Sequence, residues 1–135
     1  MKKLLSLGFV LFCLASCSDD DSTPAVSLDN LQKRWYNVST QYNGGTPAAY
    51  DGNLACGKDY LEFATGNVAK QVDVYDCQTD PRTVTGTYTA TDKTLTTALG
   101  GTTVTYDIVK LDAKVLRIST TFNGAVIQYN YTSTP

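Results

Sequence analysis

The sequence contains no histidine, one glutamate (Glu62) and one methionine, at position 1. Without histidine, neither a Ser-His-Asp nor a Cys-His catalytic arrangement can form, and one of the commonest zinc ligands is missing. The Gly100-Gly101 pair lies between β-type runs and lacks the strand-to-helix context of a phosphate-binding loop. We therefore expect no enzyme activity, no metal site and no cofactor.

Positive charge is also scarce. Eleven Lys and Arg stand against 13 Asp and Glu, giving a net charge of -2, which becomes -4 if Lys2 and Lys3 are removed with a leader. No cluster of basic residues suggests a nucleic-acid partner, and we expect none. No apolar run approaches the about 20 residues that a membrane-spanning helix needs. We expect the mature protein to be a monomer.

The first 16 residues have the three parts of a secretory signal: the basic start Lys2-Lys3, an apolar segment over 4–14, and the small residues Ala15-Ser16. Leu14-Ala15-Ser16-Cys17 closes this segment and resembles the lipobox of bacterial lipoproteins. That resemblance implies removal of residues 1–16 and a lipid on Cys17, through a thioether and an acylated amino group. The alternative is an ordinary signal peptide cut near Ala15 or Ser16, with no role for Cys17.

Ser18-Asp19-Asp20-Asp21 follows the lipobox directly. It resembles the export signal of surface lipoproteins in one group of Gram-negative bacteria. The resemblance implies an outer-membrane protein, exposed at the cell surface, whose membrane partner is reached through the lipid on Cys17. The simpler interpretation is a solvated acidic linker. In both cases residues 17–27 form a tether, and residues 28–135 have the length of one domain.

The composition of the remaining chain favours an all-β domain. Twenty Thr and nine Tyr suit pleated, half-buried surfaces. Alternating runs separated by turn signals predict eight strands near 34–41, 57–65, 68–77, 82–90, 94–99, 102–110, 114–122 and 125–132. Because nearly every link is a tight hairpin, we expect an antiparallel up-and-down β-barrel. The one long link, 43–55, is expected to lie over one mouth of the barrel.

Two cysteines remain in this domain, and the hairpin between them predicts that they pair. A two-residue turn at Gly66-Asn67 places Leu61 opposite Val72 and Cys56 opposite Cys77. Cα atoms of such a pair lie within the range that a disulfide bridges, and an exported domain meets oxidising conditions. The same register puts Gln71 and Asp73 on the outer face. A redox or metal pair is the alternative, without a Cys-x-x-Cys motif or histidine to support it.

Over roughly residues 28–132 the chain resembles the bacterial lipocalin-like domain family. The resemblance is carried by these segments: Leu31 and Trp35, Cys56-Gly57-Lys58-Asp59-Tyr60-Leu61-Glu62-Phe63, Cys77, Gly86-Thr87-Tyr88-Thr89, Tyr106-Asp107-Ile108-Val109-Lys110-Leu111, and the hairpin over 116–131. It implies an eight-stranded lipocalin-like β-barrel, here with one disulfide. Trp35 is expected to close the base of the barrel, and Glu62 to face solvent.

Four tyrosines are expected to point into the barrel: Tyr88, Tyr106, Tyr129 and Tyr131. Their rings could line a cavity for a small apolar or glycan-derived ligand, with the phenol groups fixing its orientation. Alternatively they fill the interior. The solid barrel would then act as a structural or interaction component of the cell envelope, contacting another envelope protein through its rim or outer face.

Overall fold

A computed structural model of the chain describes residues 26–135, so the predicted leader, Cys17 and most of the tether lie outside the described residues. The strands are β1 (Arg34–Tyr42), β2 (Ala48–Ala49), β3 (Tyr60–Ala64), β4 (Val68–Asp73), β5 (Arg82–Ala90), β6 (Thr94–Leu99), β7 (Thr102–Leu111), β8 (Val115–Phe122) and β9 (Ala125–Thr132). Two 3-10 turns, η1 (Leu28–Asn30) and η2 (Thr65–Asn67), accompany them. Within residues 26–135, no helix is long and apolar enough to cross a membrane.

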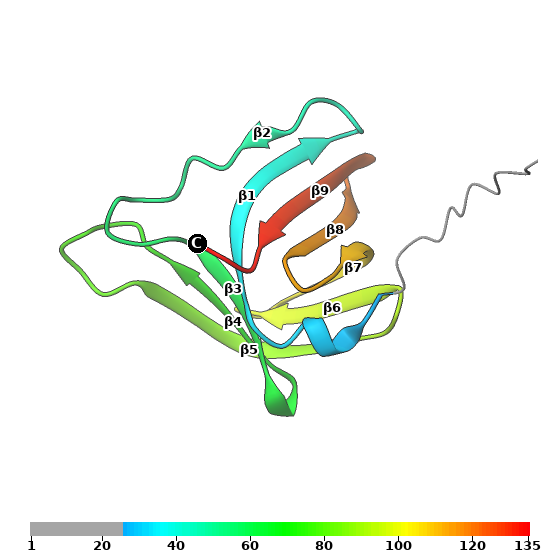
Figure 1. The fold of residues 1–135 in the computed structure, drawn as a ribbon, viewed down its shortest axis with the longest axis horizontal. Coiled ribbons are helices and arrows are strands. Elements are labelled where there is room, and N and C mark those ends of the chain that lie inside the picture. The colour runs from blue at the N-terminus through cyan, green and yellow to red at the C-terminus, as the bar shows by residue number, and fades with distance from the viewer. Residues whose placement is uncertain (1–25) are drawn as a thin grey trace, which may run out of the picture.

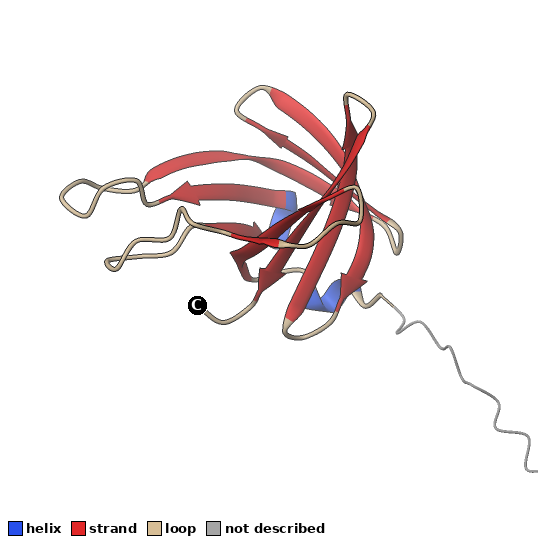
Figure 2. Ribbon diagram, turned by 90° about the horizontal axis from the view of Figure 1, so that it is seen from above, coloured by secondary structure: helices blue, strands red, loops and turns tan. Residues whose placement is uncertain are grey.

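The sheet closes on itself, as the sequence predicted. Each strand from β3 to β9 pairs antiparallel with the next, and β1 pairs with both β3 and β9. The closing ladder runs from Tyr36 opposite Thr132 to Tyr42 opposite Ile127, and Figure 1 shows β9 lying along β1. The result is a closed eight-stranded antiparallel barrel, with β2 as a short extra strand in the long link. Figure 2 shows the strands curving around the barrel.

Two hairpins have the register that their turn residues predicted. Phe122 lies opposite Ala125 around Asn123-Gly124, and Leu99 lies opposite Thr102 around Gly100-Gly101. Asn123 and Gly124 both have positive φ, 49° and 79°. This is the conformation that a two-residue hairpin turn requires, because its twist then matches that of the strands.

The predicted register of the β3–β4 hairpin is wrong by one residue. Its loop takes in Thr65 as well as Gly66 and Asn67, so Ala64 lies opposite Val68 and Leu61 lies opposite Gln71. The longer loop still places Gly66 and Asn67 at positive φ, and it seats Phe63 opposite the small Ala69 in the core. Since side chains alternate across a strand, the shift moves Gln71 and Asp73 to the inner face.

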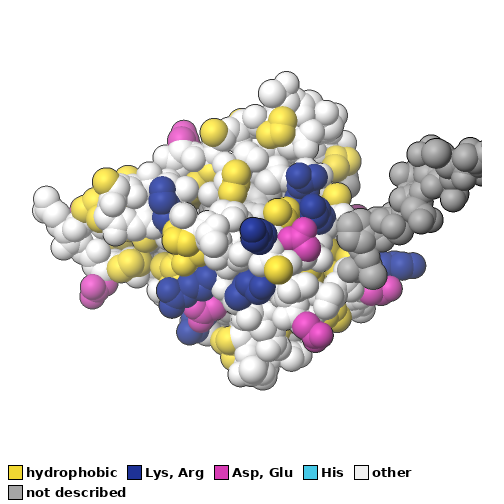
Figure 3. All heavy atoms as spheres, in the orientation of Figure 1, with side chains coloured by type: hydrophobic (Ala, Val, Ile, Leu, Met, Phe, Trp, Pro, Cys, Tyr) yellow, Lys and Arg dark blue, Asp and Glu magenta, His cyan; other side chains and the backbone are white. Residues whose placement is uncertain are grey.

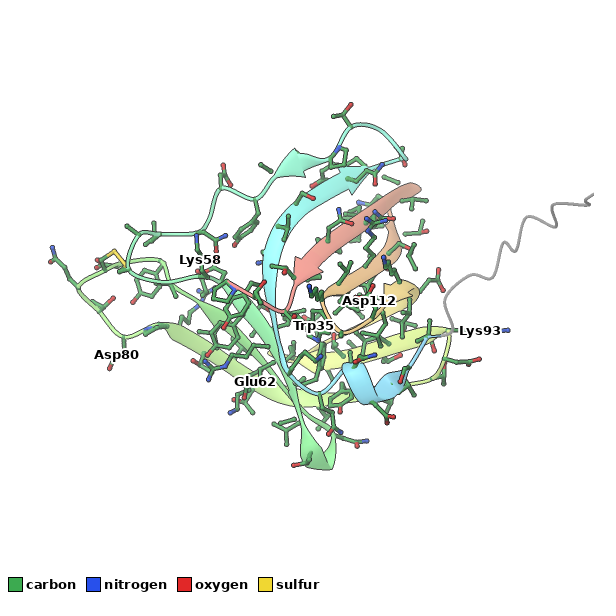
Figure 4. The ribbon with its side chains drawn as sticks, in the orientation of Figure 1. Trp35, Lys58, Glu62, Asp80, Lys93 and Asp112 are labelled. Atoms are coloured by element: carbon green, nitrogen blue, oxygen red, sulfur yellow. A yellow bond between two sulfur atoms is a disulfide. The ribbon has the colours of Figure 1, made fainter. Side chains whose placement is uncertain are left out.

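The predicted disulfide between Cys56 and Cys77 is present, with a Cα–Cα distance of 5.6 Å. It is not a ladder pair, however, because β3 begins only at Tyr60 and β4 ends at Asp73. The bond joins the two loops that extend from these strand ends, at the far left of Figure 4. It therefore closes the loops beside one end of the barrel.

The other end of the barrel, which we call the base, is solid. Trp35 is fully buried there, and its Nε1 donates a hydrogen bond to the carbonyl oxygen of Leu31 at 2.9 Å. Lys33 Nζ lies 5.4 Å from the Trp35 ring centroid. The core cluster consists of Leu31, Trp35, Phe63, Ala69, Tyr88, Leu95, Leu111, Leu116, Ile118 and Tyr131. Trp35 thus closes the base, as expected.

Glu62 lies on the outer face of the barrel, as expected, but between two cations. Its carboxylate accepts hydrogen bonds from Arg34 Nε at 2.7 Å and from Lys70 Nζ at 3.2 Å. The hydrogen bond from Arg34, followed by that from Lys70, lowers the Glu62 pKa. Figure 3 shows acidic and basic side chains side by side in the middle of this face. The face is charged but mixed in sign.

We predict that replacing both Cys56 and Cys77 by serine lowers the free energy of unfolding by about 3 kcal/mol, because the open chain gains entropy when unfolded. Urea denaturation of the non-reduced proteins measures the difference. The wild-type protein with reductant should match the double variant. An unchanged midpoint in the variant would contradict a stabilising role for the bond.

Candidate functional site

The half of the barrel opposite the base, which we call the mouth, contains a cavity of about 350 Å³. β1, β3, β4, β6, β7 and β9 each contribute to its wall, and so does the long link. This volume is at the lower end of the range typical of small-molecule sites. The barrel is therefore filled at its base and hollow at its mouth.

Three of the four tyrosines selected from the sequence lie together in this cavity: Tyr106, Tyr129 and Tyr131. The rings of Tyr106 and Tyr129 meet edge to face, with centroids 6.1 Å apart. Tyr131 is the deepest of the three, only 8 % exposed, and belongs also to the core cluster of the base. The structure thus brings these three tyrosines together on the inner face, which is the face that the alternation pattern predicted.

Tyr88, the fourth, does not line the cavity. It points inward as expected, but it lies near the end of β5 at the base. Its ring packs edge-on against Phe63 at 5.0 Å, and its hydroxyl donates to the carbonyl oxygen of Ala64 at 3.3 Å. Gln32 Nε2 donates to the same hydroxyl at 3.2 Å. Alternation gives the face on which a side chain lies, but not its height along the barrel axis.

Two further tyrosines, Tyr50 and Tyr60, contribute to the cavity wall and were not selected from the sequence. The ring of Tyr60 lies on the outer face, 5.7 Å from the Tyr36 ring and beneath Arg34. Tyr50 belongs to the long link, which was expected to cover the mouth. The link instead runs along β1, where Ala48 and Ala49 pair with Thr40 and Ser39 and Tyr50 N donates to the carbonyl oxygen of Val38 at 2.9 Å. It forms a side wall, because β3 pairs with β1 only from Arg34 to Tyr36. No turn or strand signal in the sequence predicted that the long link would form a side wall of the cavity.

Asp59 holds this side wall together. Only 5 % of the residue is exposed, and both carboxylate oxygens accept hydrogen bonds. The Tyr50 hydroxyl donates to Oδ2, and Val74 N donates to Oδ1 at 2.7 Å. Asp59 N in turn donates to Asn53 Oδ1 at 3.0 Å. One carboxylate therefore connects the long link, the start of β3 and the loop after β4, beside the disulfide.

Polar side chains occupy much of the remaining wall: Asn37, Ser39, Thr40, Gln71, Asp73 and Thr97. Gln71 and Asp73 are here because of the one-residue register shift, since the predicted pairing had placed them outside. Leu61, Val72 and Leu99 supply the aliphatic contacts. Among residues 26–135, no three His, Cys, Asp or Glu side chains gather in a way that could hold a metal ion.

The cavity phenols keep their protons at neutral pH. Burial raises the pKa of Tyr50 to about 12, and the hydrogen bond to Asp59 adds to the shift. Burial also raises the pKa of Tyr106, Tyr129 and Tyr131. Each hydroxyl can therefore both donate and accept a hydrogen bond.

Aromatic side chains also stand on the rim of the mouth. Tyr42, at the end of β1, is 57 % exposed, and Phe122, at the end of β8, is 65 % exposed. Their ladder positions put them on the same face as Ile127 and Tyr129 of β9.

The comparisons with known proteins support the fold. Neither a family model nor a curated protein matches this sequence. A crystal structure of a lipocalin-like protein from Bacteroides uniformis superposes with a TM-score of 0.59 at 14% identity, over 77% of this chain and 98% of that one. A structure of an uncharacterized protein from Bacteroides eggerthii has a TM-score of 0.58 at 12% identity, over 76% of this chain and 98% of that one. At these identities the similarity shows a lipocalin-like fold.

We predict that the folded state loses stability as the pH rises above about 10. A phenol whose pKa is raised on folding stabilises the fold fully below its unfolded pKa of about 10, and this contribution is lost as the pH rises through the folded pKa. Tyr131→Phe should reduce this alkaline loss, because its buried hydroxyl is removed. Urea unfolding at a series of pH values measures the effect. A Tyr75→Phe control, at a side chain 60 % exposed, should match the wild type.

Proposed function

We propose that this protein is a lipid-anchored, lipocalin-like binding protein of the outer membrane, exposed at the cell surface. Its ligand is a small hydroxylated molecule derived from a glycan. The observation that carries the proposal is the cavity of about 350 Å³ at the barrel mouth, lined by Tyr50, Tyr106, Tyr129 and Tyr131 and a set of amide, hydroxyl and carboxylate groups. We propose a binding role without catalysis.

The polarity of the wall favours a hydroxylated ligand over a purely apolar one. A buried polar group without a hydrogen-bonding partner costs free energy, so an apolar occupant would leave the buried Thr97 and the half-buried Asn37 without a replacement for water. A sugar offers hydroxyl groups to these side chains and apolar ring faces to Tyr106 and Tyr129. The rim rings, Tyr42 and Phe122, extend the aromatic surface outward.

The position of Val26, where the described chain begins, fits this role. The described chain begins at Val26, which packs against the core cluster at the base, and η1 follows it there. Cys17 lies nine positions earlier in the sequence. In Figure 1, η1 lies at lower right and the loops that carry the disulfide lie at left. An anchor attached on the base side leaves the mouth directed away from the membrane.

The rim supports a second candidate. Phe122 and Tyr42, together with Val126 on the outer side of β9, are large apolar side chains that are 46 to 65 % exposed. Exposed apolar side chains gathered at one place mark interaction sites. Under this alternative the rim contacts another envelope protein, and the cavity has no ligand.

We predict that the soluble domain binds a neutral disaccharide such as cellobiose. Tyr129→Phe should weaken binding about fivefold, because one hydrogen bond of about 1 kcal/mol is lost. Isothermal titration calorimetry measures both affinities, and Tyr75→Phe serves as an exposed control. Lauric acid tests the apolar ligand. Binding of lauric acid without any disaccharide would contradict the hydroxylated ligand, and binding of neither would favour the protein partner.

We predict that Cys17→Ala abolishes lipid attachment, so that the protein is no longer held at the membrane. Fractionation of cells that express each form shows this directly, and Cys13→Ala, within the leader, is the matched control that should stay at the membrane. Surface exposure is measured by adding protease to intact cells and recording how much of the protein is cleaved. Membrane retention of Cys17→Ala would refute the anchor.

A further inference from the structure

The charges around the cavity are all of one sign. Two carboxylates, Asp59 and Asp73, lie in its wall, while no Lys or Arg contributes to it, and the chain contains no histidine. Two cations lie near by in the sequence. Arg82 pairs with Asp73 at 3.6 Å but is 71 % exposed. Lys58 is exposed and is not among the lining residues of the cavity. Arg82 offsets Asp73, so the charge of Asp59 is left without a cation.

Asp59 is unusual because it is almost completely buried and yet forms no salt bridge with any residue from 26 to 135. Its two hydrogen bonds come from a phenol and a backbone amide, which are neutral donors. An ionic charge inside a protein is normally paired with an opposite charge. Because screening by water is weaker there, Asp59 makes the cavity attractive to a cation.

The aromatic side chains of the cavity also favour a cation. The faces of tyrosine rings attract ammonium groups, and the attraction increases when the site excludes water. Tyr50 lies against Asp59, and Tyr106, Tyr129 and Tyr131 line the same cavity. Since these phenols remain protonated, their hydroxyl groups bring hydrogen bonds without a negative charge.

We propose that the cavity selects a ligand with a protonated amine, so that the glycan-derived ligand is an amino sugar with a free amino group. This inference rests on the proposed function and specifies the ligand further. The ammonium group lies near Asp59 and the tyrosine rings, while the hydroxyl groups meet Asn37, Gln71 and Thr97. Acidic sugars are excluded by the same carboxylates.

Three disaccharides of similar size test the proposal: the β-1,4 dimer of glucosamine, cellobiose and cellobiouronic acid. On the same β-1,4-linked skeleton the first carries two ammonium groups, one at C2 of each sugar, the second only hydroxyl groups, and the third one carboxylate at C6. At about pH 6, where the amine is protonated, calorimetry should show the amine binding about fivefold to tenfold more tightly than cellobiose, and the acid more weakly than cellobiose. The preference for the amine should decrease in about 1 M salt.

Isosteric variants locate the source of the preference. Asp59→Asn retains an oxygen that accepts from Val74 N, and it should reduce the ratio of amine to cellobiose affinity to near one. Asp107→Asn is the matched control, because it removes the same charge from an exposed position on the outer face of β7. It should leave the ratio unchanged. Circular dichroism and the urea midpoint of Asp59→Asn show whether the variant is folded, so that a change in the ratio is compared between folded proteins.

The outcomes separate this inference from the proposed function. If cellobiose binds as well as the amine, or the acid binds best, the charge selection is wrong and the glycan-binding function stands. An equal loss of preference in Asp59→Asn and Asp107→Asn would also overturn it, because the effect would then come from net charge. If none of the three disaccharides binds, both proposals fail.

Discussion

The mismatch in length between β1 and β3 is the constraint on which the cavity depends. β1 has nine residues and pairs with β9 from Tyr36 to Tyr42, whereas β3 pairs with it only at Arg34–Tyr36. Above that point β1 needs another partner for its backbone groups, which cannot be left unpaired inside a closed sheet. The link between β1 and β3 supplies it through β2 and Tyr50 N. A regular strand there would have closed the wall, while the link brings Tyr50 and polar groups inward.

Asp59 and the disulfide keep this irregular wall in place by different means. The disulfide limits the freedom of the unfolded loops, and Asp59 fixes the folded geometry through Tyr50 and Val74. A buried carboxylate is a costly way to join three segments, but it offers a separate acceptor oxygen to each of its two donors, whereas an amide offers only one oxygen. Its charge also sets this cavity apart from an apolar barrel interior. The packed base, closed by Trp35, stabilises the barrel. The mouth can therefore remain hollow while the protein stays folded.

Most of the barrel could be predicted from the sequence because its information is local. Asn123-Gly124 and Gly100-Gly101 each determine a register through turn geometry, and the alternation of Leu116, Ile118 and Tyr129 determines a face. The β3–β4 hairpin was predicted wrongly because Gly66-Asn67 fits a two-residue or a three-residue loop equally well. Packing of Phe63 against Ala69 favours the longer loop, and this choice moves Asp73 into the cavity.

The sequence by itself determined the strand order and the inward face of Tyr106, Tyr129 and Tyr131, since each follows from neighbours along one hairpin. It also predicted the pairing of Cys56 with Cys77, the two cysteines of the domain, although the ladder position expected for the bond was wrong. It also contains the lipobox-like segment that ends at Cys17. Only the tertiary structure decided the depth of each inward side chain, which separates Tyr88 from the other three, and the path of the long link. Both depend on contacts between segments distant in sequence. The meeting of Tyr50 and Asp59 is of this kind, because only closure of the barrel brings the link against the start of β3.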